Sequence, residues 1–178
     1  MKEFKIKSTI YHGTITRIEN INLQEGKWYK DFGKGFYLAY DKKQSAKMMV
    51  KRYNQAKQRK QQVDGKYLYA FDTVQEVLEQ CKTKIFNEAD IEWLDFVLDC
   101  RKSAGTPHEY DIVIGPTADD DTNLCLNMYW EGVYGPVGSI EAKRTLLEQL
   151  EVENLGMQVF IGTEKGLALL NNKREEKE

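Results

Sequence analysis

The sequence has few cysteines, little net charge and no long apolar segment. Its three cysteines are an odd number with no CxxC spacing, which argues against a disulfide framework and against a zinc site. The formal net charge of −2 over 178 residues gives no basic field, so nucleic acid is not an expected partner. No stretch approaches the ~18 apolar residues of a membrane span, and the N-terminus shows no signal-peptide pattern. We therefore expect a cytoplasmic protein without a membrane segment.

The sequence does contain a mixture of short strand patterns and amphipathic helix patterns. Asp41 and Ser139 each precede a helical pattern and are expected to cap it, and the helix that contains Trp93 and Cys100 is expected to start at Asn87 or Asp90. A chain of this length buries about 70% of its unfolded surface, enough for one core, so we expect a single domain over 8–171 and a frayed tail over 172–178. Strands are predicted at 8–11, 36–39, 67–71, 84–86, 111–115 and 158–161, and helices at 42–56, 91–100, 123–130, 140–150 and 165–170.

The most informative segment is Phe32–Ala39, which reads FGKGFYLA. Its two glycines permit a tight turn and a close approach of the backbone to a ligand. The strand that follows places Tyr37 on one face and Phe36 on the other. About twenty residues earlier, a Tyr-His-Gly-Thr segment brings His12 to the end of another strand, so His12 and Tyr37 are candidates to lie side by side. The alternative is a plain strand after a glycine turn, with Tyr37 as a core aromatic.

The order and spacing of four segments resemble the ADP-ribosyltransferase domain of the His-Tyr-Glu type, as in diphtheria toxin and the poly(ADP-ribose) polymerases. These segments are His12-Gly13, Gly33 to Tyr37, Ser45-Ala46 and Gln158 to Ile161. The chain is also similar to a family of short bacterial proteins with the blocks YHG, DFGKGFYL, DIVIGPxADD and QVxFxTEKAL. The resemblance implies an α+β ADP-ribosyltransferase-like fold, with two small packed β-sheets and flanking helices.

The resemblance also implies a site for NAD, used as the substrate. In it, His12 would hydrogen-bond the adenosine ribose, and the Gly13 backbone and the Ser45 hydroxyl would hold the nicotinamide carboxamide. Tyr37 would stack on the nicotinamide ring, and Tyr29 would supply a second ring. From the residues alone, His12 can equally be a structural strand residue and Ser45 an ordinary first-turn residue. The cofactor-binding set expected from the resemblance is His12, Gly13, Thr14, Tyr29, Gly35, Phe36, Tyr37 and Ser45, and the catalytic set is Gln158, Tyr37 and His12.

The sequence departs from the resemblance at Gln158, where the His-Tyr-Glu enzymes have a glutamate. An amide accepts a hydrogen bond from the ribose 2′-hydroxyl but brings no charge to the oxocarbenium-like transition state, which commonly costs on the order of 10² to 10³ in rate. Three alternatives follow: slow transfer, a carboxylate borrowed from Glu164 or from residues 119–121, or binding without turnover. Gln158→Glu is expected to raise NAD cleavage, unless another carboxylate lies close enough to repel the new one.

Residues 119–121 are three consecutive aspartates directly after a predicted strand. They are expected to cap the helix that follows, and contact with a metal or with the substrate is the alternative. No metal site is predicted. Glu164 is expected in the first turn of a helix. The basic segment 42–60 is expected to form a solvated helix face.

The function expected from the resemblance is mono-ADP-ribosyl transfer from NAD to an unidentified protein acceptor. A role as a bacterial or phage-conflict toxin, with an antitoxin-like partner, agrees with this resemblance. The alternatives are a catalytically silent module that binds a nucleotide or a protein, and an NAD glycohydrolase.

Overall fold

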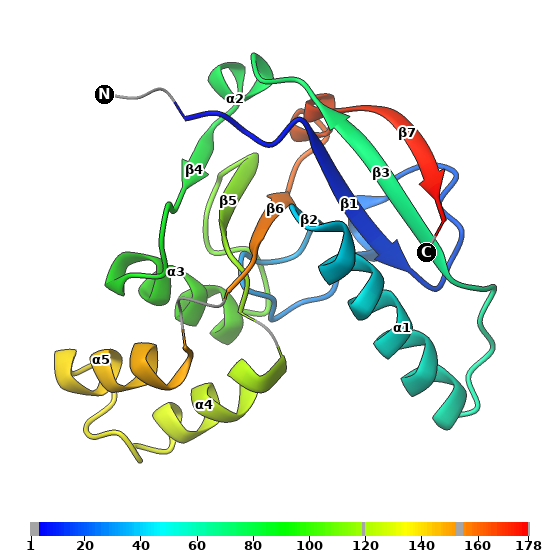
Figure 1. Cartoon of the computed structure of the whole chain (residues 1–178). Coiled ribbons are helices and arrows are strands. Elements are labelled where there is room, and N and C mark those ends of the chain that lie inside the picture. Colours follow the sequence, from blue (N-terminus) through cyan, green and yellow to red (C-terminus); the bar gives the residue numbers. More distant parts are fainter. Residues whose placement is uncertain (1–3, 119, 152–154, 178) are drawn as a thin grey trace.

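The computed structural model describes residues 4–118, 120–151 and 155–177, with backbone only for residues 120 and 121. The described part is an α+β structure with one mixed sheet of seven strands, in the order β4-β5-β6-β2-β1-β3-β7 (Figure 1). The β4–β5 pair is parallel and the other neighbouring strands are antiparallel. The strands are β1 Thr9–Thr14, β2 Phe36–Ala39, β3 Tyr67–Thr73, β4 Thr83–Ile85, β5 Ile112–Pro116, β6 Met157–Ile161 and β7 Leu170–Glu176.

The two packed sheets expected from the sequence are instead one sheet with a weak junction in its middle. β1 pairs with β3 from Thr9 to Thr14, and β2 pairs with β6 from Phe36 to Ala39. Between β1 and β2, however, the ladder holds the single pair Tyr11↔Ala39. Strand pairing thus joins the two halves of the sheet, β4-β5-β6-β2 and β1-β3-β7, at one position. We call this position the β1–β2 junction.

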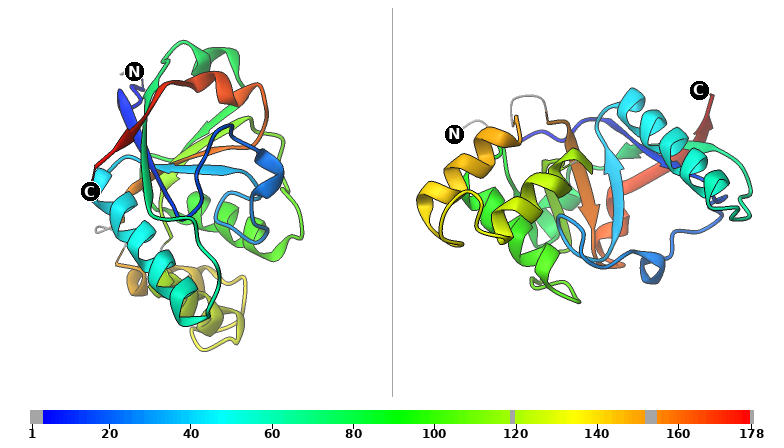
Figure 2. Two further views of the ribbon diagram at one scale, coloured as in Figure 1. Left: turned by 90° about the vertical axis from the view of Figure 1, so that its right-hand side faces the viewer. Right: turned by 90° about the horizontal axis from the view of Figure 1, so that it is seen from below.

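Apart from the short helix α2, the α-helices gather in two places (Figures 1 and 2). α3, α4 and α5 lie together at one end of the molecule, and α1 lies apart from them, against β1, β2 and β3. The predicted caps Asp41 and Ser139 are confirmed, and of the alternatives Asn87 and Asp90 the structure has Asp90 as the cap of α3. These three side chains accept hydrogen bonds from backbone N–H groups in the first turns of α1, α5 and α3. The helices are α1 Lys42–Gln58, α2 Val77–Gln80, α3 Ile91–Lys102, α4 Asp120–Trp130 and α5 Ile140–Gln149.

Apolar side chains cover both faces of the sheet. Along β5, Val113 packs with α3, α4 and α5, while Ile112 and Ile114 belong to a second cluster on the other face. β2 alternates in the same way, as predicted: Tyr37 packs against the first cluster and Phe36 against the second. Successive residues of β2 therefore pack on opposite faces of the sheet.

Two predictions about the C-terminal region are wrong. The helix expected at 165–170 is a short 3-10 turn, Gly166–Leu169, followed directly by a strand. Residues 172–176, expected in a frayed tail, belong to β7 and pair with β3. Their sequence is polar and shows no strand pattern, but the open edge of β3 supplies hydrogen-bond partners, and an ion pair of 2.8 Å joins Glu176 to Lys42 at the start of α1.

Candidate functional site

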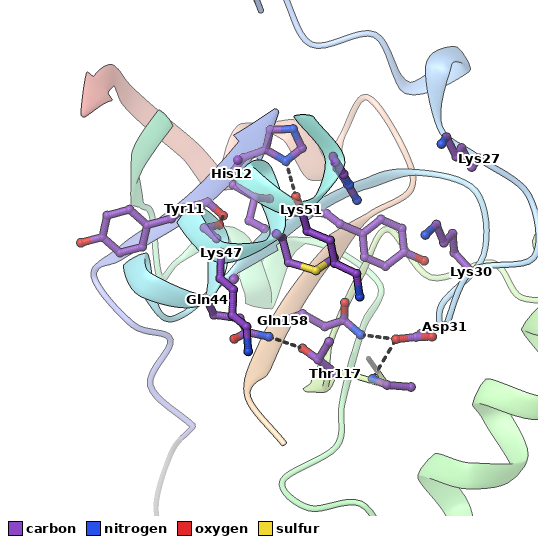
Figure 3. A pocket seen from close by; sticks show the side chains of 18 of the residues that line it. Tyr11, His12, Lys27, Lys30, Asp31, Gln44, Lys47, Lys51, Thr117 and Gln158 are labelled. Carbon is purple, nitrogen blue, oxygen red and sulfur yellow. Dashed lines mark hydrogen bonds between the residues drawn. The ribbon is translucent and has the colours of Figure 1, made fainter. Parts of the chain in front are cut away.

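A pocket of about 460 Å³ lies over the β1–β2 junction, between α1 and the segment 27–31 (Figure 3). Its lining combines residues from β1, β2, α1, α3, α4 and β6, together with the segment 27–31 and the residues that follow β5. Of the predicted site residues, the pocket brings together His12, Gly13, Tyr29, Tyr37, Ser45 and Gln158. Thr14, Gly35 and Phe36 do not line it.

Gly13 and Ser45 show how closely α1 approaches β1. A Cβ at Gly13 would lie 2.3 Å from the carbonyl oxygen of Ser45 and 2.9 Å from Cβ of Met49. The buried Ser45 hydroxyl donates to the carbonyl oxygen of Tyr11 at 3.0 Å. The glycine is therefore required by the packing of the helix on the strand, and the Ser45 oxygen keeps its lone pairs for a donor in the pocket.

His12 spans the β1–β2 junction. Its Nδ1 lies 2.6 Å from the carbonyl oxygen of Tyr37, and because a carbonyl only accepts, Nδ1 carries the proton. Burial lowers the pKa of His12 to about 4, which the hydrogen bond to Tyr37 only partly opposes. The His12 ring also packs on the Phe36 ring, with 4.3 Å between the two ring centroids. At neutral pH, His12 is therefore a neutral imidazole in a fixed tautomer, with Nε2 as a hydrogen-bond acceptor.

The Tyr37 ring is held in place through its hydroxyl group, which makes two hydrogen bonds. Its hydroxyl donates to the carbonyl oxygen of Gly33 at 2.7 Å and accepts from the backbone N–H of Phe32 at 3.0 Å. Gly33 has a φ of +92°, which a residue with a Cβ adopts only under strain, so the turn that receives the hydroxyl depends on this glycine. Burial raises the pKa of Tyr37 well above its usual value, and the phenol stays neutral. The result is a rigid aromatic wall with no freedom to ionise.

Gln158 lies at the bottom of the pocket and contacts a residue that the sequence did not single out. Its Nε2 donates to Oδ2 of Asp31 at 2.8 Å and to the carbonyl oxygen of Pro116 at 3.4 Å. Asp31 also accepts from the backbone N–H of Ala118 at 2.9 Å, and Nε and Nη2 of Arg101 donate to its other oxygen at 2.9 and 2.5 Å. Asp31 is 5% exposed. A buried ion pair thus supports Gln158 from below.

The charge of the pocket lining is strongly positive. Among the described lining residues, Asp31 is the only carboxylate, whereas six are cationic: Lys27, Lys30, Lys47, Lys51, Arg52 and Arg101. Burial lowers the pKa of Lys30, and the neighbouring Arg52 guanidinium lowers it further. Lys47, Lys51 and Arg52 are exposed, as predicted for the basic face of α1, but this face also forms one wall of the pocket. The lining therefore favours an anionic ligand.

Two exposed aromatic residues stand in the segment 27–31. Trp28 and Tyr29 are 46% and 54% exposed, and the Lys34 ammonium lies 4.5 Å from the centroid of the Trp28 ring. Tyr29 has a φ of 59°, a left-handed conformation that is uncommon for an aromatic residue. Both residues line the pocket, so a planar ligand group would find aromatic surface here as well as at Tyr37.

Of the carboxylates considered as alternatives to a glutamate, Glu164 is the one whose side chain the structure describes. Asp119 lies outside the described residues, and residues 120 and 121 begin α4 with side chains that also lie outside them. Glu164 is exposed and does not line the pocket. In the part of the chain that the structure describes, no group of three or more histidine, cysteine or acidic residues is arranged for a metal ion. Within the same residues, no helix combines the length and apolarity that a bilayer crossing requires.

The fold and the site together define an α+β protein with a basic pocket, walled by aromatic rings, at the centre of a mixed sheet. The chain belongs to the family described as protein of unknown function (DUF3990), whose model matches residues 8–172. No curated protein and no solved structure matches the chain.

Proposed function

We propose that this protein binds NAD in the pocket over the β1–β2 junction and transfers ADP-ribose from it to a protein acceptor. The observation that carries the proposal is the convergence of His12, Gly13, Tyr37, Ser45 and Gln158, from β1, β2, α1 and β6, on one pocket. The resemblance to the His-Tyr-Glu enzymes assigns all five to NAD. These residues are far apart in sequence, so their meeting in one place is not a consequence of the local motifs.

Size and charge support the same ligand. A volume of about 460 Å³ lies within the range of roughly 300 to 1,000 Å³ that small-molecule sites occupy. The cationic lining residues other than Arg101, which pairs with Asp31, suit a pyrophosphate, and the fixed Tyr37 ring suits a stacked nicotinamide. Gly13 packs against the backbone of Ser45, and the Ser45 hydroxyl lies 3.0 Å from the carbonyl oxygen of Tyr11 on the same strand, so both expected partners of a carboxamide come from one small part of the pocket.

The transfer itself breaks the bond between nicotinamide nitrogen and ribose C1′. The electron pair of this bond leaves with nicotinamide, and a nucleophilic side chain of the acceptor bonds to C1′ and loses its proton. Rigid placement of the nicotinamide ring by Tyr37, of the nicotinamide ribose by Gln158 and of the adenosine ribose by His12 would lower the barrier through orientation. An amide at position 158 stabilises the positive charge of the transition state less than a glutamate would, so we expect slow turnover.

A second candidate function is NAD binding without turnover. It is favoured by one observation: Asp31, the only carboxylate among the described lining residues, is paired with Arg101 and turned into hydrogen bonds beneath the pocket. Little negative charge then faces a developing cation. A regulatory partner that controls access, of the antitoxin kind, would fit either function.

Incubation with biotin-labelled NAD and a cell lysate separates these functions. Labelled protein bands support the transferase, nicotinamide release without labelled protein indicates a glycohydrolase, and saturable binding alone indicates a binding module. His12→Gln is the site variant for this experiment. Thr14→Ala is the matched control, because Thr14 follows on the same strand but does not line the pocket. If NAD produces neither binding nor turnover in the wild-type protein, the proposal is wrong.

A further inference from the structure

The amide of Gln158 has only one orientation that its surroundings allow. On one side it faces Oδ2 of Asp31 at 2.8 Å and the carbonyl oxygen of Pro116 at 3.4 Å. Both are acceptors, and Asp31 is acceptor-only when ionised, so the side that faces them must be the NH₂ group. The carbonyl oxygen Oε1 is then turned away from Asp31 and toward the side chains of α1 that wall the pocket (Figure 3).

Asp31 is itself fixed, so it determines the position of Gln158 rather than adapting to it. Its two oxygens accept from four donors: Nε and Nη2 of Arg101, the backbone N–H of Ala118 and Nε2 of Gln158. The Arg101 guanidinium is held in turn by the side chain of Asn123 and the carbonyl oxygen of Ala118. Four donors fill the acceptor capacity of a carboxylate.

We infer that Asp31 is the positioning residue of the site: it orients Gln158 so that the pocket presents an amide oxygen, and this oxygen accepts a hydrogen bond from a hydroxyl group of the ligand. This inference rests on the proposed function, for which the ligand hydroxyl is the 2′-hydroxyl of the nicotinamide ribose. It makes residues 31 and 158 one unit and assigns the site to ligands that carry a hydroxyl at this point.

The same contact explains why position 158 holds an amide. A glutamate here would bring a second acceptor-only group against Asp31 and the Pro116 carbonyl, and two carboxylates this close do not both ionise freely. Asp31 also polarises the amide, because a charged acceptor at the N–H strengthens the carbonyl oxygen of the same amide as an acceptor. Asp31, in the segment 27–31, thus supplies through this amide part of the electrostatic stabilisation that a glutamate at position 158 would give.

The first test compares NAD with the NAD analogue that lacks the 2′-hydroxyl on the nicotinamide ribose, by calorimetric titration. The wild-type protein is expected to bind NAD on the order of tenfold more tightly, as for the loss of one hydrogen bond. Gln158→Met, which removes the amide and leaves the Asp31–Arg101 pair, is expected to bind both ligands equally. Asp31→Asn is expected to lose most of the discrimination, because an asparagine can accept from Gln158 or donate to it. Full discrimination in Asp31→Asn would overturn the inference.

A double variant covers a failure of Asp31→Asn to fold. Asp31→Asn/Arg101→Gln removes both charges of the pair and so leaves no unpaired buried guanidinium, and the loss of discrimination is expected here as well. Full discrimination in this double variant would contradict the inference.

A second measurement does not depend on NAD. In a ¹H–¹⁵N correlation spectrum, the signals of the two side-chain NH₂ protons of Gln158 are identified by their loss in Gln158→Met. Their chemical shifts are expected to differ widely, because one of the protons faces a carboxylate. This difference in chemical shift is expected to become small in the Asp31 variants. Wild-type protein that binds NAD but does not discriminate the analogue would refute this inference and leave the proposed function intact. Absence of NAD binding would refute the proposed function, and the spectrum would then decide the orientation of Gln158 separately.

Discussion

Replacing Gln158 by glutamate tests the site most directly. On the resemblance alone, this change would restore a catalytic charge and raise NAD cleavage. The structure reverses this expectation, because Nε2 of Gln158 lies 2.8 Å from Oδ2 of Asp31. Two negative charges at this distance repel by about 6 kcal/mol with an effective dielectric constant of about 20. Binding a proton to the introduced carboxyl at pH 7, against its usual pKa of about 4.3, costs about 4 kcal/mol.

Protonation of the introduced carboxyl costs less free energy than the repulsion between two charges. The Gln158→Glu variant is therefore expected to take up a proton on folding. Its folded-state pKa is raised above the unfolded value, so the variant keeps its stability below about pH 4.3 and loses it as the pH rises. We expect a deficit in the free energy of unfolding relative to wild type of about 1 kcal/mol at pH 5, rising to about 4 kcal/mol at pH 7. NAD cleavage at pH 7 is expected to fall.

Urea unfolding at several pH values between 5 and 7 measures this deficit. Gln44→Glu is the matched control, because Gln44 also lines the pocket but its Nε2 donates to the hydroxyl of Thr117, a group that can turn and donate to a carboxylate. A deficit that does not change with pH, or an equal deficit in Gln44→Glu, would refute the proposed contact between the two charges.

Three further predictions concern the walls of the pocket. NAD is expected to raise the melting temperature of the wild-type protein, by an amount equivalent to about 2.7 kcal/mol at 100 times its Kd, and Tyr37→Ala is expected to abolish the shift; an unchanged wild-type curve at millimolar NAD would exclude the pocket assignment. Gly13→Ala is expected to cost about 1 to 3 kcal/mol in urea unfolding and to weaken NAD binding, since the new Cβ would lie 2.3 Å from the Ser45 carbonyl oxygen and 2.9 Å from Cβ of Met49; normal stability in this variant would mean that α1 does not press on β1. Burial lowers the pKa of His12 to about 4 in the folded protein, so the free energy of unfolding of the wild type is expected to fall by up to about 3 kcal/mol as the pH falls from 6.5 to 4. His12→Gln is expected to lack this part of the pH dependence. The same pH dependence in both proteins would show that the surroundings of His12 do not lower its pKa.

The local parts of the fold were predictable from the sequence, because short-range chemistry determines them. Asp41, Asp90 and Ser139 are residues that accept a hydrogen bond from a helix N-terminus, and each caps the helix that follows it. The alternation of Phe36 and Tyr37 along β2 follows from the geometry of any strand. The α+β class followed from the same patterns together with the resemblance.

The long-range parts were not predictable in this way. Asp31 is 127 residues from Gln158, and no spacing rule joins an aspartate before a glycine turn to a late strand. β7 has a polar sequence and forms because β3 offers it an edge. The junction of the sheet at the single pair Tyr11↔Ala39 depends on the packing of both halves. The one local signal for Asp31 is its position, directly before the glycine turn and strand of Phe32–Ala39.

The β1–β2 junction has a consequence for how the molecule responds to force and heat. Of the residues that line the pocket, His12 and Gly13 belong to one half of the sheet, and Tyr37 and Gln158 to the other. Besides the paired strands, the Nδ1–H of His12 on Tyr37 is a further bond across the junction. A ligand that contacts all four residues acts as a cross-link between the halves. A bound ligand would then add to the coupling that the shared apolar cluster already gives the two halves, so that they unfold more cooperatively when the pocket is filled.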